Sequence, residues 1–333
     1  MSFQDIKGHD NITRFFKREL ELKRQASAYL LFGPDATGKT LLATTLSKAM
    51  NCLEKDNDSC DKCIPCTKID RRNHPDLVII ENKEGKDLIG IAAIRDLQKK
   101  ISLKPYEGRM KVFIIQDSHT MTEEAQNCLL KTLEEPPQNS VIILITSKIE
   151  GLLLTVRSRC KQIKFGSLDL KLRVELAERQ GFLKEDALFL SRLANSGIPF
   201  SVSSEEKEEN RGLIDYKNTI LDEFNTGKTL FDERSSIFSG SKEKMKFVIS
   251  IIESWFRDIA VLKSTKDASL VINFDRTDEL GKMQAKLSYE ELEEILNQIK
   301  TAQFYIERNV GPKLAFNVLK MKTKELTGAK ETI

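Results

Sequence analysis

The stretch AYLLFGPDATGKTLLATTLSKAM, residues 28–50, joins a short apolar run to a glycine-rich loop and then to a helical pattern. In the loop GPDATGKT, a P-loop spacing is formed by Gly33, Gly38, Lys39 and Thr40. Backbone N–H groups at a helix start bind phosphate, a lysine at this position reaches the β- and γ-phosphates, and a threonine hydroxyl holds Mg²⁺. The stretch predicts binding of ATP with Mg²⁺. The alternative is a relic loop that binds nucleotide weakly or not at all.

Many such loops have a third glycine where this chain has Ala36. A Cβ atom hinders a left-handed backbone, so this alanine argues against a fully competent loop.

Four further apolar runs follow AYLLF, separated by longer helical patterns. They are LVII (77–80), VFII (112–115), VIILI (141–145) and QIKF (162–165). This alternation is typical of an α/β fold, a parallel sheet with helices on both faces. After the third of the five runs, Thr120 and Glu123 predict a capping box, and Pro136-Pro137 predicts the end of that helix.

Strand patterns nearly cease after about residue 165. We expect a short helical segment at about 168–196, the charged connection SSEEKEEN (203–210) and a helical bundle with its strongest helices at 244–262, 289–309 and 313–322. The sequence therefore predicts a nucleotide-binding-type domain over 1–166, a small helical domain over 167–210 and an all-helical domain over 211–333.

The composition is that of an ordinary soluble protein, with 40% hydrophobic and 31% charged residues among 333. A net charge of +3 and a single Trp argue against a dedicated DNA-binding surface, so DNA contact is expected to be local or shared with partners. The sequence has neither a long uncharged apolar run nor a signal-peptide pattern at its start. These features predict a cytoplasmic protein without membrane association.

The segment CLEKDNDSCDKCIPC, about residues 52–66, holds four of the six cysteines: Cys52, Cys60, Cys63 and Cys66. Four thiolates within reach of one tetrahedron suit a structural Zn²⁺, and such a closed site has no catalytic role. Free surface thiols and an iron–sulfur cluster are the alternatives. The isolated Cys128 is expected to be a small buried apolar residue.

Three polar features have two interpretations each. His74 and His119 lack a second catalytic residue at a defined spacing and are expected to be structural rather than catalytic. The turn TVRSRC, 155–160, is either a solvated basic turn or the source of an arginine that stabilises a transferring phosphoryl group in a neighbouring subunit. Composition does not choose between them.

Taken in order, the P-loop, the CxxCxxC cluster, HPDLVII, GRMKVFII, NCLLKTLEEPP, VIILIT and TVRSRC resemble the clamp-loader branch of the AAA+ proteins, and within it the delta-prime subunits of bacterial DNA polymerase III. The resemblance covers nearly the whole chain. It implies an AAA+ domain, a helical lid and a helical collar. It also implies a hetero-oligomeric ring with gamma/tau and delta subunits, which opens a sliding clamp and closes it around primed DNA.

The resemblance also assigns residues. Ser158, Arg159 and Cys160 match the SRC motif, in which Arg159 would act as an arginine finger on ATP held by an adjacent subunit. Thr146 falls where motor subunits place a polar sensor of the γ-phosphate. The four clustered cysteines match the family's zinc ligands, and the P-loop residues match a loop that only some delta-prime subunits keep.

Two departures from the motor subunits follow. Their third strand ends in Asp-Glu, whereas this chain has Gln116, which is uncharged, and Asp117, which is one methylene shorter than Glu. The stretch NSGIPFSV, 195–202, also lacks the arginine that senses phosphates in motors. The combination predicts a stator subunit of the polymerase III holoenzyme with weak or absent ATPase activity. The alternatives are an active gamma/tau-like motor and a zinc-bearing nucleotide-binding module unrelated to replication.

Overall fold

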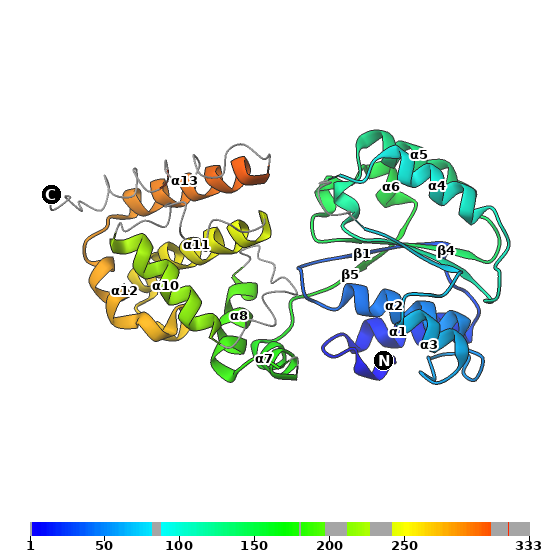
Figure 1. Cartoon of the computed structure of the whole chain (residues 1–333), viewed down its shortest axis with the longest axis horizontal. Coiled ribbons are helices and arrows are strands. Elements are labelled where there is room, and N and C mark those ends of the chain that lie inside the picture. The colour runs from blue at the N-terminus through cyan, green and yellow to red at the C-terminus, as the bar shows by residue number, and fades with distance from the viewer. Residues whose placement is uncertain are drawn as a thin grey trace. The chain divides into compact units, whose positions relative to one another are not determined.

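The computed structural model describes residues 2–81, 88–179, 181–196, 212–226, 242–307 and 319. The chain divides into two compact units, Met1–Asp169 and Leu170–Ile333. The first unit is α/β and the second is helical (Figure 1). The expected boundary between the small helical domain and the all-helical domain, at 210, lies outside the described residues.

A five-stranded sheet forms the centre of the first unit. Its strands are β1 (Ala28–Phe32), β2 (Leu77–Ile80), β3 (Lys111–Ile115), β4 (Ser140–Thr146) and β5 (Lys161–Lys164). They lie in the order β2-β3-β4-β1-β5, and every neighbouring pair is parallel. The five apolar runs are therefore confirmed as strands of one parallel sheet.

Helices cover both faces of this sheet, as expected (Figure 1). On one face lie α1 (Asp10–Glu21), α2 (Lys39–Asn51) and α3 (Ile64–Asp70); on the other lie α4 (Ile91–Ile101), α5 (Glu123–Glu134) and α6 (Leu154–Ser158). Alternate strand residues enter opposite cores. Tyr29 and Leu31 pack with α1 and α2, whereas Leu30 packs with the residues of α4 and α5. Short 3₁₀ turns lie at Phe3–Asp5, Ser118–Thr120 and Ile149–Gly151.

The cap of α5 differs from the prediction. The helix begins at Glu123, its N-cap is Thr122, and the Thr122 side chain accepts a hydrogen bond from the Ala125 backbone N–H. The Thr120 hydroxyl instead donates to the Asp117 carbonyl inside the preceding 3₁₀ turn. The capping box expected at Thr120 and Glu123 is therefore wrong, because Thr120 belongs to the 3₁₀ turn and its hydroxyl bonds within that turn. The helix does end before Pro136, at Glu134.

The second unit contains α7 (Leu170–Arg179), α8 (Lys184–Asn195), α10 (Leu213–Thr226), α11 (Lys242–Thr265), α12 (Thr277–Gln284) and α13 (Tyr289–Glu307), with 3₁₀ turns at Ala268–Leu270 and Phe274–Arg276. The buried Trp255 of α11 belongs to the same core as Phe189 of α8 and Ile299 of α13. The helical segment expected at about 168–196 consists of two helices, α7 and α8, with Gly181 at a φ of 97° between them.

Two of the three strongest expected helices, α11 and α13, are confirmed. The third, at 313–322, and the connection 203–210 lie outside the described residues, apart from the buried Leu319. Among the helices that the structure describes, none combines the length and apolar character needed to cross a membrane.

Candidate functional site

The loop between β1 and α2 has the backbone that the P-loop spacing predicts. Gly33 has a φ of 143°, and a Cβ atom there would lie 2.2 Å from the Phe165 carbonyl oxygen. Gly38 is the N-cap of α2 with a φ of 88°. Ala36 also adopts a left-handed φ of 56°, so the loop takes a glycine-like conformation there in spite of the Cβ. The N-terminus of α2 can thus present its N–H groups to an anion.

Lys39, the first residue of α2, is buried with 6% of its surface exposed. Its ammonium donates to the carbonyl oxygens of Gly33, at 2.8 Å, and Pro34. Burial lowers the pKa of Lys39, and the charges of Asp35 and Asp117 oppose that effect. A phosphate would have to draw Lys39 away from these carbonyls. Thr40 lies beside it, half-buried in the first turn of the helix.

His9 completes the loop's surroundings and was missed in the sequence. Its Nε2 donates to the Thr37 carbonyl at 3.0 Å, and its ring meets Phe165 edge to face at 4.7 Å. Burial lowers the pKa of His9, so the ring is neutral at pH 7. A lone histidine 28 residues before Thr37 gives no local signal, and only the packing of α1 beside α2 brings the two together.

Gln116 and Asp117 follow β3 at the carboxyl edge of the sheet. The Gln116 backbone N–H continues the ladder to the Ile80 carbonyl at 2.9 Å. Asp117 is exposed and left-handed, with a φ of 43°. Its charge raises the pKa of Lys39, which places its carboxylate within electrostatic range of the P-loop. The structure thus brings together Asp117 and Lys39, the two charged groups expected at this site.

Thr146 ends β4 beside the same loop. Its carbonyl accepts from the Gly33 N–H at 3.3 Å, and its buried hydroxyl lies 3.1 Å from His119 Nδ1. His74 is buried elsewhere, and its Nδ1 accepts from the Asp76 N–H at 3.1 Å. Both histidines have local partners, in keeping with the structural roles expected for them.

The SRC residues lie at the end of α6. Arg159 is the C-cap, and its guanidinium donates to the Thr155 carbonyl at 2.9 Å and to Glu134 of α5 at 2.5 Å. About a third of the Arg159 side chain, 34%, remains exposed. The Ser158 hydroxyl donates to the Thr155 carbonyl, whereas Cys160 is buried, which raises its thiol pKa to about 12.

Arg159 and the P-loop lie at opposite edges of the sheet. The P-loop leaves the carboxyl end of β1, whereas Arg159 precedes the amino end of β5, which runs parallel to β1. The five residues of β1 separate these edges by roughly 13 Å, because a strand rises about 3.3 Å per residue. Arg159 therefore belongs to a different face of the unit from its own phosphate loop.

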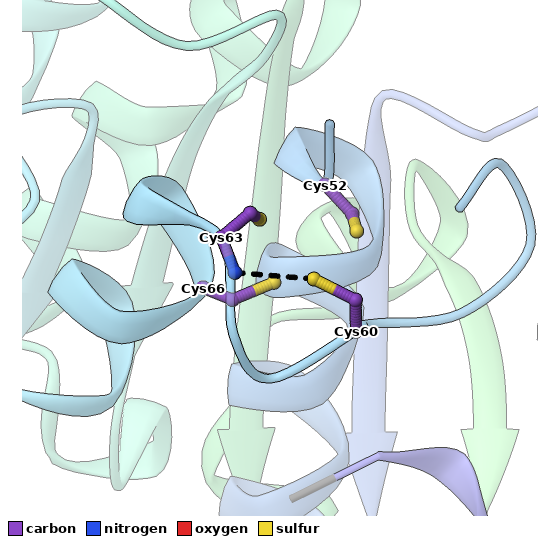
Figure 2. A group of neighbouring side chains, drawn as sticks. All are labelled: Cys52, Cys60, Cys63 and Cys66. Carbon is purple, nitrogen blue, oxygen red and sulfur yellow. Dashed lines mark hydrogen bonds between the residues drawn. The ribbon is translucent and has the colours of Figure 1, made fainter. Parts of the chain in front are cut away.

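The four clustered cysteines converge (Figure 2). Their sulfur atoms all lie within 4.8 Å of one another, and an ion about 2.3 Å from each would need separations of about 3.8 Å. Cys52 and Cys66 are buried, and the Cys63 N–H donates to Cys60 Sγ at 3.2 Å. Burial raises the pKa of the Cys66 thiol, a penalty that a bound cation would offset. The cluster could hold one metal ion. Cys128 stands apart and is only half-buried, less than expected.

The first unit is similar to known proteins. Residues 8–169 match the family described as DNA polymerase III, delta subunit. The chain is 36% identical to DNA polymerase III subunit tau of Bacillus subtilis over 49% of its length, and 34% identical to subunit delta' of the same organism over 56%. It spans 29% and 56% of those two proteins, respectively.

Among solved structures, a gamma subunit-related protein of Thermotoga maritima is 17% identical with a TM-score of 0.49, over 95% of this chain and 99% of that one. The relatives bear the names of tau, gamma/tau and delta' subunits, so the names do not separate these roles for this chain. Through residues 8–169, just under half of its length, this chain is similar to subunits of DNA polymerase III.

Proposed function

We propose that this chain is the delta-prime, or stator, subunit of a DNA polymerase III clamp loader, which lends Arg159 to ATP bound by a neighbouring subunit. The observation that carries the proposal is the position of Arg159 at the sheet edge opposite its own P-loop. A guanidinium there cannot reach phosphates on Lys39 of the same chain. Its exposed third is available to a second subunit.

The chain's own loop supports the same role. Lys39 donates to loop carbonyls, and the strand end offers Gln116 and an exposed, left-handed Asp117 instead of two acids. A catalytic group misplaced by about 1 Å costs roughly 100-fold in rate. Gly33, Gly38, Lys39 and Thr40 could hold ATP, with Mg²⁺ on Thr40 and Asp117 and with Thr146 near the γ-phosphate. A nucleotide bound at this loop would stabilise the structure of the subunit and would be hydrolysed slowly.

The partners follow from the same proposal. Arg159 would face a gamma/tau subunit, the delta subunit would complete the ring, and the assembly would act on the sliding clamp and primed DNA during replication. Cys52, Cys60, Cys63 and Cys66 would hold a structural Zn²⁺ that stabilises residues 52–66. Metal analysis should find one Zn²⁺ per chain, and a folded wild-type protein without metal would exclude this centre.

Arg159→Ala tests the role in trans. The surface pair with Glu134 contributes under about 1 kcal/mol, so the isolated variant should fold and bind nucleotide as the wild type does. In the assembled ring, DNA-stimulated ATP hydrolysis at the neighbouring subunit's site, to which Arg159 would be supplied, should fall by up to about 10³-fold. Arg157→Ala is the matched control, because that side chain donates to the Leu152 carbonyl of its own chain. Equal ring activity for both variants would refute the finger.

An active gamma/tau-like motor is the second candidate. It is favoured by the intact backbone of the P-loop and by the charge of Asp117 near Lys39. The two roles separate in one measurement, steady-state ATP hydrolysis by the purified chain. Turnover comparable with a gamma/tau subunit, abolished by Lys39→Met, would replace the stator proposal.

A further inference from the structure

A buried lysine lies next to the cysteine cluster and bonds to two aspartates in the segments that carry the cysteines. Lys48 lies on α2, one helical turn before Cys52, and its side chain has 0% exposure. Its ammonium donates to Asp61 Oδ1 at 2.6 Å and to Asp70 Oδ2 at 3.1 Å. The two carboxylates are partly exposed, at 32% and 40%, so the lysine is the buried member of this group.

Asp61 connects this charge to the sulfur atoms. It lies in the turn between Cys60 and Cys63, where its φ is 59°. It directly follows Cys60 in the chain, and its side chain accepts from Lys48. Its carboxylate also accepts from the Ser59 hydroxyl at 2.9 Å. Fixing the side chain of Asp61 therefore fixes the turn next to Cys60.

Asp70 connects the same charge to the helix that carries Cys66. It ends α3, which begins directly after Cys63. The ammonium of Lys48 thus joins the three elements that supply all four cysteines: the end of α2, the turn 60–63 and α3. Four thiolates around a divalent cation leave a net negative charge, which a nearby buried ammonium partly offsets.

We propose that Lys48 is a positioning residue for the metal centre, which it preorganises through Asp61 and Asp70 without touching the ion. The inference rests on the metal binding proposed above. Groups that orient metal ligands through hydrogen bonds typically change metal affinity by about 10–100-fold when they are replaced. A methionine at residue 48 would fill the space but remove the ammonium that donates to both aspartates, so the turn and α3 would lose their common link to α2.

Lys48→Met in the full chain, with Lys62→Met as control, tests the proposal. Lys62 lies in the same turn between Cys60 and Cys63 but is exposed, so its charge is screened by solvent. Zinc affinity, measured under reducing conditions against a chromophoric chelator, should fall about 10–100-fold for Lys48→Met and less than about threefold for Lys62→Met. Of these two variants, only Lys48→Met should shift the d–d bands of the Co²⁺-loaded protein, because only Lys48→Met alters the geometry of the ligands.

Asp70→Asn keeps the proposal testable if Lys48→Met fails to fold. This side chain is partly exposed, and its replacement turns the ion pair with Lys48 into a weaker, neutral hydrogen bond while Asp61 still holds the lysine. It should show the same weakening to a smaller degree. Wild-type affinity and an unchanged Co²⁺ spectrum in a folded Lys48→Met or in Asp70→Asn would overturn the inference. A wild-type chain that takes up neither ion would instead refute the metal site itself.

Discussion

Replacing Asp76 by asparagine should destabilise the first unit by about 3 kcal/mol. Asp76 has 1% exposure, and its carboxylate accepts three backbone N–H groups, from Tyr106 at 2.7 Å, Glu107 at 2.9 Å and Gly108 at 2.8 Å. These bonds anchor the loop that leads from α4 into β3. The motif HPDL, which the sequence offers only as a family resemblance, thus has a structural role here.

The magnitude follows from the acceptor geometry. Asparagine retains one oxygen, which at the Oδ2 position keeps the bonds from Glu107 and Gly108 and loses the one from Tyr106. A hydrogen bond to a charged group contributes about 1.5–3 kcal/mol and a neutral one about 0.5–1.5 kcal/mol. One bond lost and two weakened give about 3.5–6 kcal/mol, and contributions within one network are less than additive, so a loss of about 3 kcal/mol is expected.

The pH dependence has a defined sign. Burial raises the pKa of Asp76, but the hydrogen bonds from the three backbone N–H groups lower it by more. The pKa of Asp76 therefore lies below its ordinary value of 3.8. A depressed folded-state pKa gives stability that is fully present above the unfolded pKa and is lost as the pH falls through the folded one. The difference in the free energy of unfolding between wild type and Asp76→Asn should therefore be constant near neutral pH and shrink below about pH 4.

Urea unfolding at pH 7 and at acid pH is the assay, with the slope of each transition compared to confirm an unchanged unfolded state. Asp96→Asn is the control, because Asp96 is exposed and forms only an i,i+4 pair with Lys100 at 3.2 Å. That pair contributes about 0.3–0.5 kcal/mol. Coincident midpoints for the two variants at pH 7 would show that the carboxylate does not anchor the loop.

Three further predictions concern the nucleotide loop and the SRC turn. Gly33→Ala should lower the thermal midpoint more than Gly38→Ala does, because a Cβ meets the Phe165 carbonyl at residue 33 and nothing within 4 Å at residue 38; equal midpoints would contradict that close approach. Ala36→Gly should raise the free energy of unfolding by up to about 1 kcal/mol and so raise the thermal midpoint. A left-handed alanine costs about 1–2 kcal/mol, and the greater entropy of glycine in the unfolded chain offsets about 0.5–1 kcal/mol of the gain. Cys160, whose pKa burial raises to about 12, should resist alkylation of the native chain at pH 8 and react after unfolding; rapid native labelling would show that the SRC turn opens.

Much of the fold could be predicted because its signals are local. Four of the five strands are short apolar runs, as a parallel sheet covered on both faces requires, whereas the edge strand β5, KQIK, is mostly exposed. The cap of α5 could not be predicted as securely, since Thr120 and Thr122 are both good caps. The choice between them depends on the 3₁₀ turn that follows Asp117. Gly181 was similarly overlooked as the break between α7 and α8.

The sequence by itself determined the P-loop, the four cysteine positions and the SRC turn, because each depends on residue types at fixed spacing along the chain. Only the tertiary structure decided that Arg159 and Lys39 lie at opposite edges of the sheet, that His9 contacts the loop, and that Lys48 is buried against Asp61 and Asp70. These relations join residues up to 120 positions apart. They arise from the parallel strand order and from helix packing, which no local pattern encodes.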